Sequence, residues 1–200
     1  MEEVIIATKN RGKAREFERI FNAKGLSVKT LLDFPEIEDV EETGTTFEEN
    51  AIIKAETIAN IVGKMVIADD SGLEVDALEG RPGVYSARYA GTEKNDEANI
   101  DKVLTELQDI RENERTARFR CVLAVARPNR ETKTFAGTCE GRILLKRKGT
   151  NGFGYDPIFF VDEKGLSMAE LAPEEKNKIS HRAKAIQKLE ANLSLVDGQS

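Results

Sequence analysis

Residues 3–21 read EVIIATKNRGKAREFERIF, and this stretch decides the fold. Residues 3–8 are mostly apolar, which is typical of a short buried strand, and Ala14, Phe17, Ile20 and Phe21 recur at helical spacing. Gly25 is placed to end that helix. A strand that leads through a short loop, residues 9–13, straight into a helix predicts an α/β protein.

The rest of the chain continues this alternation without an internal repeat or a linker. Thr45 and Thr46 each precede a glutamate by three residues, a capping box that predicts a helix beginning here, with Phe47 and Ala51 on its apolar face. We therefore expect one compact α/β domain with a mixed sheet. The expected strands are residues 26–31, 65–68, 73–78, 117–127, 132–138, 141–146 and 158–161, and further helices include the apolar stripe of 100–110 and residues 173–193, the last in one piece or two.

Composition and charge exclude several classes of protein. Hydrophobic residues make up 40% of the 200 residues, which is enough for a sizeable core and excludes a disordered chain. The net charge of −6 argues against a general binder of nucleic acid or anionic membrane. The longest apolar run, residues 121–126, is far too short to span a membrane, and the acidic start is unlike a signal peptide. We expect a cytoplasmic protein with no nucleic-acid or membrane partner.

Cysteine and histidine are too scarce for most metal centres. Two cysteines and one histidine cannot build a structural zinc site, so any metal would be held by carboxylates. Carboxylate ligands favour Mg²⁺, with Mn²⁺ as the alternative. Cys121 and Cys139 would face each other if strands 117–127 and 132–138 pair as a hairpin; a disulfide is then sterically conceivable, but a reducing cytoplasm favours two buried thiols.

The loop between the first strand and the first helix is a candidate phosphate site. Backbone N–H groups at a helix start point outward, and the helix dipole favours a negative charge there. The sequence is not a Walker A motif, because Ala7 and Ala14 stand where that motif needs a glycine and a Ser or Thr. The alternative is an ordinary exposed basic turn. The candidate residues are Thr8, Lys9, Asn10, Arg11, Gly12 and Lys13.

Asp69-Asp70-Ser71-Gly72 follows four apolar residues and is the strongest physical indication of a site. Ligands of open α/β sheets bind at the carboxyl ends of strands, which is where we expect these acids. Two adjacent carboxylates are costly to bury unless a cation or a donor compensates them. Because neighbouring residues of an extended chain point in opposite directions, the two aspartates are expected to do different work. The alternative is a turn initiated by Asp69.

An acidic segment, residues 36–49, precedes the capped helix. Most of it is interpreted as a solvated face. Glu41 and Glu42 are the members best placed to supply a second Mg²⁺ ligand. Lys54, one turn into the same helix, is positioned to reach a phosphate.

Two later segments are suited to binding a flat, carbonyl-bearing ring. Glycines on both sides of Phe153 leave its ring open to stacking, and Asp156 could accept a hydrogen bond from a base. Donors cluster over residues 176–182, which include His181 and Arg182. A plain turn and a solvated basic helix are the alternatives. Taken together, the segments predict a nucleoside triphosphate site.

The chain resembles the inosine triphosphate pyrophosphatase family, which hydrolyses deaminated purine nucleotides such as ITP, dITP and XTP. Six segments carry the resemblance, in the family's order and across nearly the whole chain. They are Ala7-Thr-Lys-Asn-Arg-Gly-Lys13, Glu41-Glu-Thr-Gly-Thr-Thr-Phe47, Ala68-Asp-Asp-Ser-Gly-Leu73, Pro82-Gly-Val-Tyr-Ser-Ala-Arg88, Gly152-Phe-Gly-Tyr-Asp-Pro157 and Ile179-Ser-His-Arg182. Lys9 stands where many relatives carry glycine.

The resemblance implies an elongated single α/β domain over residues 1–200, with a long mixed β-sheet, two lobes that flank a substrate cleft, and a homodimer. It implies Asp70 as general base and Mg²⁺ ligand, and Glu41 as the other metal ligand. Ser71 and Lys54 would act at the phosphates together with residues 8–13. The implied base pocket consists of Phe153, Gly154, Tyr155, Asp156, Lys176, His181 and Arg182.

Two other functions stay open at this point. One is a pyrophosphatase of the same chemistry that acts on modified pyrimidine or methylated nucleotides. The other is a nucleotide-binding regulator without catalytic activity.

Overall fold

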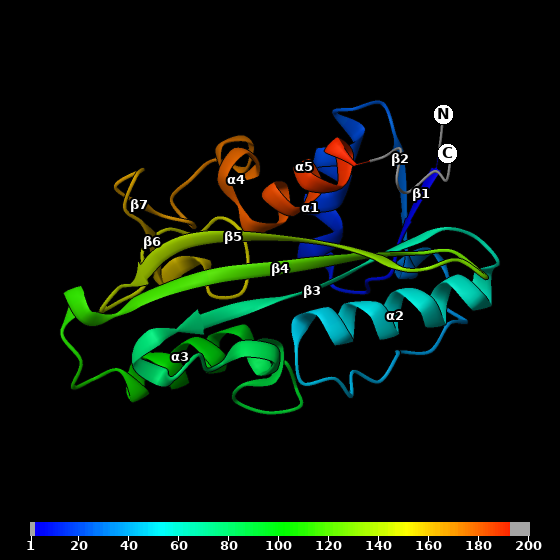
Figure 1. Ribbon diagram of the computed structural model, residues 1–200. Coiled ribbons are helices and arrows are strands. Elements are labelled where there is room, and N and C mark those ends of the chain that lie inside the picture. The colour runs from blue at the N-terminus through cyan, green and yellow to red at the C-terminus, as the bar shows by residue number, and fades with distance from the viewer. Residues whose placement is uncertain (1–2, 193–200) are drawn as a thin grey trace. The chain divides into compact units, whose positions relative to one another are not determined.

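The computed structural model describes residues 3–192, and it contains one seven-stranded mixed sheet in the order β2-β1-β3-β4-β5-β6-β7 (Figure 1). β1 is parallel to β2 and β3, whereas β6 is antiparallel to β5 and β7. The expected α/β class with a mixed sheet is therefore confirmed. The strands are β1 Glu3–Ile6, β2 Ser27–Thr30, β3 Val66–Val75, β4 Thr116–Ala126, β5 Lys133–Ile143, β6 Phe159–Val161 and β7 Leu166–Ser167.

Five α-helices accompany these strands in the described residues. They are α1 Arg11–Asn22, α2 Phe47–Val62, α3 Asp96–Glu106, α4 Pro173–Ile179 and α5 His181–Ala191. The described chain divides into two compact units. The first comprises residues 3–70, 121–137 and 182–192, and the second comprises residues 71–120 and 138–181.

The first unit is built on the parallel strands β1, β2 and β3. Phe17 and Phe21 of α1 pack into one apolar cluster with Ile6 of β1, Ile67 of β3 and Ile186 of α5. In Figure 1, α1 and α5 lie on one face of these strands and α2 on the other. Burial of such side chains contributes about 1.5–3 kcal/mol each, so this cluster fixes the loop that joins β1 to α1.

The starts of α1 and α2 in the first unit are both capped. The side chain of Asn10 accepts a hydrogen bond from the Lys13 N–H at 3.0 Å, and Thr46 with Glu49 forms the predicted capping box. α2 ends at Gly63, whose φ of 65° is the left-handed conformation that glycine adopts without strain. A cap of this kind contributes about 1 kcal/mol.

The second unit has its own core. Leu73 and Val75 of β3 pack with Ile100 and Val103 of α3 and with Phe159 of β6. The loop 83–91 is fixed to α3 by Asn99, whose amide accepts from the Ala90 N–H and donates to the Ala87 carbonyl. The hydroxyl of Tyr155 donates to the Ser86 carbonyl at 2.7 Å, which joins the 151–157 segment to the same loop.

The prediction that one strand ends at residue 68 and another begins at residue 73 is wrong. β3 runs without interruption from Val66 to Val75, so Asp69 and Asp70 lie inside a strand rather than at its carboxyl end or in a turn. The reason is electrostatic: the flanking elements supply cations and donors to these acids, and the strand can then bury them. Residues 76–78, expected to be strand, form a 3₁₀ turn.

Two other differences concern the strands. β5 continues through residue 143 as one strand, so the separate strand at 141–146 is wrong, and residues 144–146 lie outside it. β7 was not expected. The expected helical segment 173–193 forms two helices, one of the two forms that the sequence allowed, with a break at Ser180, whose ψ of 154° is extended. α5 ends at Ala191, and residue 193 of the expected range lies outside the described residues.

Cys121 and Cys139 are both buried thiols, as a reducing compartment favours. Within residues 3–192, none of the helices combines the length and the apolar character that a bilayer span requires.

Candidate active site

The β1–α1 loop presents polar groups at the start of α1. Asn10 caps the helix, and the Thr8 hydroxyl accepts a hydrogen bond from the Asn10 N–H at 3.1 Å. Lys9 instead turns to the acidic segment, where its ammonium donates to the Ile37 carbonyl at 2.6 Å and lies 3.0 Å from Asp39. Arg11 and Gly12 form the first turn of α1, Arg11 exposed and Gly12 buried.

Asp69 is the centre of a buried charged cluster in the first unit. Its side chain forms an ion pair with Lys13, accepts from Nε and Nη2 of Arg182 at 3.3 and 3.2 Å, and accepts from the Cys121 thiol at 3.0 Å. Arg182 also pairs with Glu16 of α1. Asp69 and Arg182 are each 1% exposed. The cluster compensates its own charges, which is the condition for burying them.

These partners fix the ionisation of the cluster. Burial by itself would raise the pKa of Asp69, but the charges of Arg182 and Lys13 outweigh it and hold this pKa well below its ordinary value. Burial disfavours the charged form of Lys13, yet Asp69 and Asp70 together outweigh that effect and raise the pKa of Lys13. Asp69 is therefore a permanent anion that orients Lys13.

Asp70, the next residue in β3, behaves in the opposite way. Burial raises its pKa from 3.8 to about 6, with smaller contributions from Glu42 and Asp69, while Lys13 and Lys54 act to lower it. A carboxylate with a pKa close to neutrality can accept a proton at physiological pH, which is what a general base requires. The two acids therefore differ in electrostatic environment, and their different roles stay a prediction.

Lys54 of α2 connects the acidic segment to β3. Its ammonium donates to the Asp69 carbonyl at 3.1 Å and forms an ion pair with Glu42. Glu42 is half-buried and contributes to the electrostatic environment of Asp70, whereas Glu41 is exposed. Of the two glutamates that the sequence left open, Glu42 is the one at the cluster.

The donor set suits a divalent cation that is shared with a ligand. Among the described residues, no three acidic, cysteine or histidine side chains gather into a metal centre. Mg²⁺ needs no such centre, because it retains several waters and takes one or two carboxylates together with phosphate oxygens. Asp70 and Glu42 fit that requirement.

The second unit forms a separate cluster around the 151–157 segment. Oδ2 of Asp156 accepts from the Phe153 N–H at 3.0 Å and from the Lys176 ammonium at 2.6 Å. That ammonium lies 4.8 Å from the centre of the Phe153 ring. A Cβ on Gly152, whose φ is 75°, would lie 2.0 Å from the same Asp156 oxygen, so only glycine permits this approach.

The remaining predicted base-site residues are distributed as follows. Gly154 donates its N–H to Asp96 at 3.0 Å, and the Tyr155 hydroxyl donates to the Ser86 carbonyl. His181 is buried and stacks on Phe119, with ring centres 4.9 Å apart. Ser71 follows Asp70 in β3 and is half-buried.

Arg182 does not lie in this second cluster. It belongs to the first unit, where Asp69 and Glu16 hold its guanidinium. Sequence reasoning missed Glu16 and Cys121 as partners in the charged cluster. Glu16 lies three residues after Lys13 and next to Phe17 on the buried face of α1, and this acid on an otherwise apolar helix face was the available signal.

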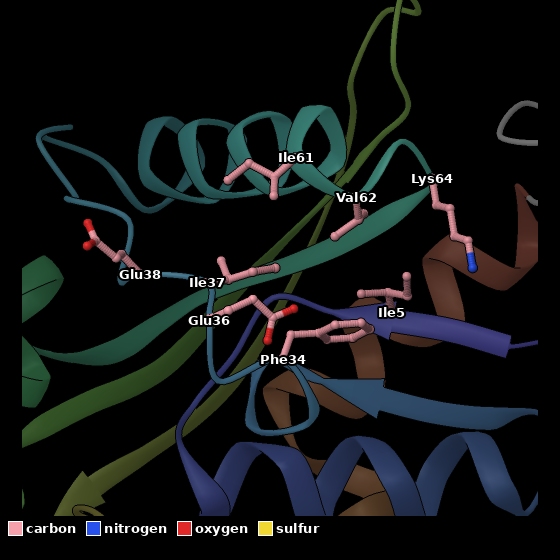
Figure 2. Close-up of a pocket in the computed structure, with 8 residues that line it drawn as sticks. All are labelled: Ile5, Phe34, Glu36, Ile37, Glu38, Ile61, Val62 and Lys64. Carbon is pink, nitrogen blue, oxygen red and sulfur yellow. The ribbon is translucent and has the colours of Figure 1, made fainter.

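The first unit also contains a pocket of about 530 Å³ that shares no residue with the charged cluster (Figure 2). Ile5 of β1 and Ile61 and Val62 of α2 form its apolar lining with Phe34 and Ile37, and the charged side chains Glu36, Glu38 and Lys64 complete it.

Comparison with known proteins identifies the family. Residues 4–192 match the model of the Ham1 family. A dITP/XTP pyrophosphatase of Halalkalibacterium halodurans is 62% identical over 190 residues, which cover 95% of this chain and 98% of that protein. A dITP/XTP pyrophosphatase of Bacillus subtilis is 60% identical over 189 residues, which cover 94% and 96% of the two chains.

The fold agrees with this relationship. The structure of the Staphylococcus aureus Ham1 protein superposes on this one with a TM-score of 0.85 at 49% sequence identity. The superposition covers 100% of each chain. The resemblance recognised in the sequence motifs is thereby confirmed. The chain belongs to the Ham1 family.

Proposed function

We propose that this protein hydrolyses deaminated purine nucleoside triphosphates, such as dITP, ITP and XTP, to the monophosphate and pyrophosphate. The printed activity of its relatives supports this substrate class. The observation that carries the chemistry is the pair Asp69 and Asp70, two adjacent buried carboxylates with opposite pKa shifts, set among Lys13 and Lys54.

The phosphate end is assigned to the first unit. Thr8, Asn10 and the N–H groups at the start of α1 are suited to oxygen anions, because unpaired N–H groups and the helix dipole act there together. Lys13 and Lys54 would stabilise the negative charge that develops on the leaving pyrophosphate. Ser71 would add a hydroxyl donor, while Lys9, Arg11 and Gly12 complete the loop.

Asp70 is the proposed general base. It would take the proton that the attacking water loses, while the water oxygen bonds to the α-phosphorus and the bond from that phosphorus to the bridging oxygen breaks. Its raised pKa favours this transfer, since a proton can be held on Asp70 near neutral pH. The products are a nucleoside monophosphate and pyrophosphate.

A divalent cation is part of the proposal, Mg²⁺ first and Mn²⁺ as the alternative. Asp70 and Glu42 would hold it, with Glu42 replacing Glu41 as the second carboxylate because Glu42 is the one paired with Lys54. When bound, the cation would offset phosphate charge and polarise the phosphorus–oxygen bonds.

The base end is assigned to the second unit. A purine could stack on Phe153, and Lys176 and His181 would donate to the 6-oxo group that distinguishes deaminated purines from adenine. Adenine offers an amino donor at that position and would leave a buried donor unpaired.

The proposal also includes the oligomeric state, the compartment and the cellular task. Residues 1–200 would act as one catalytic domain in a cytoplasmic homodimer, and its cellular task would be to remove deaminated nucleotides before polymerases incorporate them.

The experiment is a panel of ITP, dITP, XTP, GTP, ATP and dUTP, each with Mg²⁺ and with EDTA, assayed separately for pyrophosphate and orthophosphate. We expect pyrophosphate from the first three, and only with Mg²⁺. Preferred turnover of dUTP would point to a pyrimidine-directed enzyme, and tight ITP binding without any product would point to a regulator.

A further inference from the structure

The backbone of Gly44 lies directly against helix α2. Its N–H donates to Oδ1 of Asn50 at 2.7 Å, and Asn50 is completely buried. A Cβ on Gly44 would lie 2.7 Å from that oxygen and 2.7 Å from Cβ of Glu49. The loop before α2 can therefore approach the helix this closely only because residue 44 is glycine.

The same turn of α2 holds the two following residues. Oε2 of Glu49 accepts from the N–H groups of Thr45 and Thr46 at 2.7 and 3.3 Å. These contacts are exposed to solvent, whereas the contact made by Asn50 is part-buried and its acceptor belongs to a fully buried side chain. Loss of a hydrogen bond costs more where the group left without a partner is buried. Asn50 is thus the interior anchor of the loop 42–46.

The spacing along α2 relates this anchor to the charged cluster. Asn50 and Lys54 are four residues apart, so their side chains lie on the same face of the helix. Lys54 pairs with Glu42, which precedes the anchored Gly44 by two residues. One helix face therefore binds the loop at Gly44 and receives its carboxylate one turn further along.

We infer that Asn50 is a positioning residue that sets the carboxylate of Glu42 for cation binding. This inference rests on the proposed function and assigns to Asn50 no contact with substrate. A second feature of Asn50 supports it: Nδ2 is buried, and within the described part of the chain it has no hydrogen-bond acceptor. A residue that only filled this space would be better apolar, so the amide is retained for the geometry that its oxygen imposes.

The test compares variants on both sides of the Gly44–Asn50 hydrogen bond. Asn50→Leu keeps the volume and removes the acceptor, and Gly44→Ala keeps the acceptor and forces the loop away. Asn50→Asp keeps an acceptor oxygen and serves as the conservative rescue. Thr57→Ala, at an exposed position of α2 where the hydroxyl donates to the Ile53 carbonyl of the same helix, is the matched control.

The experiment measures the affinity for Mn²⁺ in the presence of the α,β-methylene analogue of ITP. Binding is monitored by the electron paramagnetic resonance signal of Mn²⁺. We expect Asn50→Leu and Gly44→Ala each to weaken Mn²⁺ binding about tenfold or more, the usual consequence of losing a residue that orients a metal ligand. The double variant should lose less Mn²⁺ affinity than the product of the two single fold-losses, since both substitutions act on one contact. Asn50→Asp and Thr57→Ala should bind Mn²⁺ as the unmodified protein does.

The melting temperature, read together with Mn²⁺ affinity, separates a positioning role of Asn50 from a merely structural one. If Asn50→Leu and Gly44→Ala melt earlier but bind Mn²⁺ within twofold of the unmodified protein, Asn50 is merely structural and the inference is overturned. Should the unmodified protein fail to hydrolyse ITP, the proposed function fails instead, and that result is independent of the variants.

Discussion

Asp69 and Asp70 are adjacent residues of strand β3, and their pKa values move in opposite directions. Asp69 is held as an anion by Arg182 and Lys13, whereas burial raises the pKa of Asp70 to about 6. Environments that shift the pKa values of neighbouring titratable groups in opposite directions are typical of acid–base sites. One short stretch of strand thus supplies both a fixed charge that orients a lysine and a carboxylate that can exchange a proton.

Glu41 and Glu42 form a natural matched pair. Glu42→Gln should raise the Mg²⁺ concentration needed for half-maximal turnover of ITP by about tenfold or more, because it removes the carboxylate that pairs with Lys54. Glu41→Gln changes the same charge at an exposed neighbour and should leave this concentration within twofold. The reverse pattern would assign the cation to Glu41.

The raised pKa of Asp70 predicts a pH-dependent stability difference. Between pH 3.8, the ordinary pKa, and about 6, the folded protein binds the proton and the unfolded chain does not, so this group's contribution to stability falls as pH rises. In EDTA at pH 7 and above, Asp70→Asn should therefore be more stable than the unmodified protein, by about 3 kcal/mol at 1.4 kcal/mol per pKa unit.

Urea unfolding of both proteins from pH 4 to pH 8 measures this difference. It should be near zero at pH 4 and reach its full value above the raised pKa. A difference that does not change with pH would show that Asp70 titrates normally in the folded state.

Asp156 is expected to govern nucleotide affinity. Asp156→Ala removes the acceptor for the Phe153 N–H and leaves the Lys176 ammonium buried without its carboxylate. The loop that presents the Phe153 ring should loosen, and the KM for ITP should rise by about tenfold or more, since loss of one charged hydrogen bond costs about 1.5–3 kcal/mol.

The variant Asp156→Asn retains an acceptor for the Phe153 N–H and should recover part of that loss. Steady-state kinetics on both variants provide the measurement, with kcat expected to change much less than KM. An equal fall of kcat and kcat/KM would instead place Asp156 in the chemical step.

Arg182 should be important for folding whatever its part in substrate binding. Arg182→Met leaves Asp69 and Glu16 buried without their shared cation and should lower the free energy of unfolding by about 3–5 kcal/mol. Arg130→Met, at an exposed position in the turn between β4 and β5, is the control. Equal urea midpoints for the two variants would contradict the buried cluster.

The sequence predicted those features of the fold that depend on local patterns. The capping box at Thr46 follows from residue types within one turn. The continuity of β3 could not be predicted, because Asp69 stays in a buried extended strand only when Lys13 and Arg182, distant in sequence, compensate its charge. The choice between Glu41 and Glu42 likewise depends on Lys54, which only the folded chain brings to one of them.

The most direct test of the account is the turnover of ITP by Asp70→Asn, with pyrophosphate and orthophosphate measured separately. We predict that kcat falls by about 10²–10⁴, the usual contribution of a general base, while the variant still binds the α,β-methylene analogue of ITP. Pyrophosphate should be the primary product of the unmodified protein. Turnover of Asp70→Asn at the unmodified rate, or orthophosphate as the first product of the unmodified protein, would contradict the account.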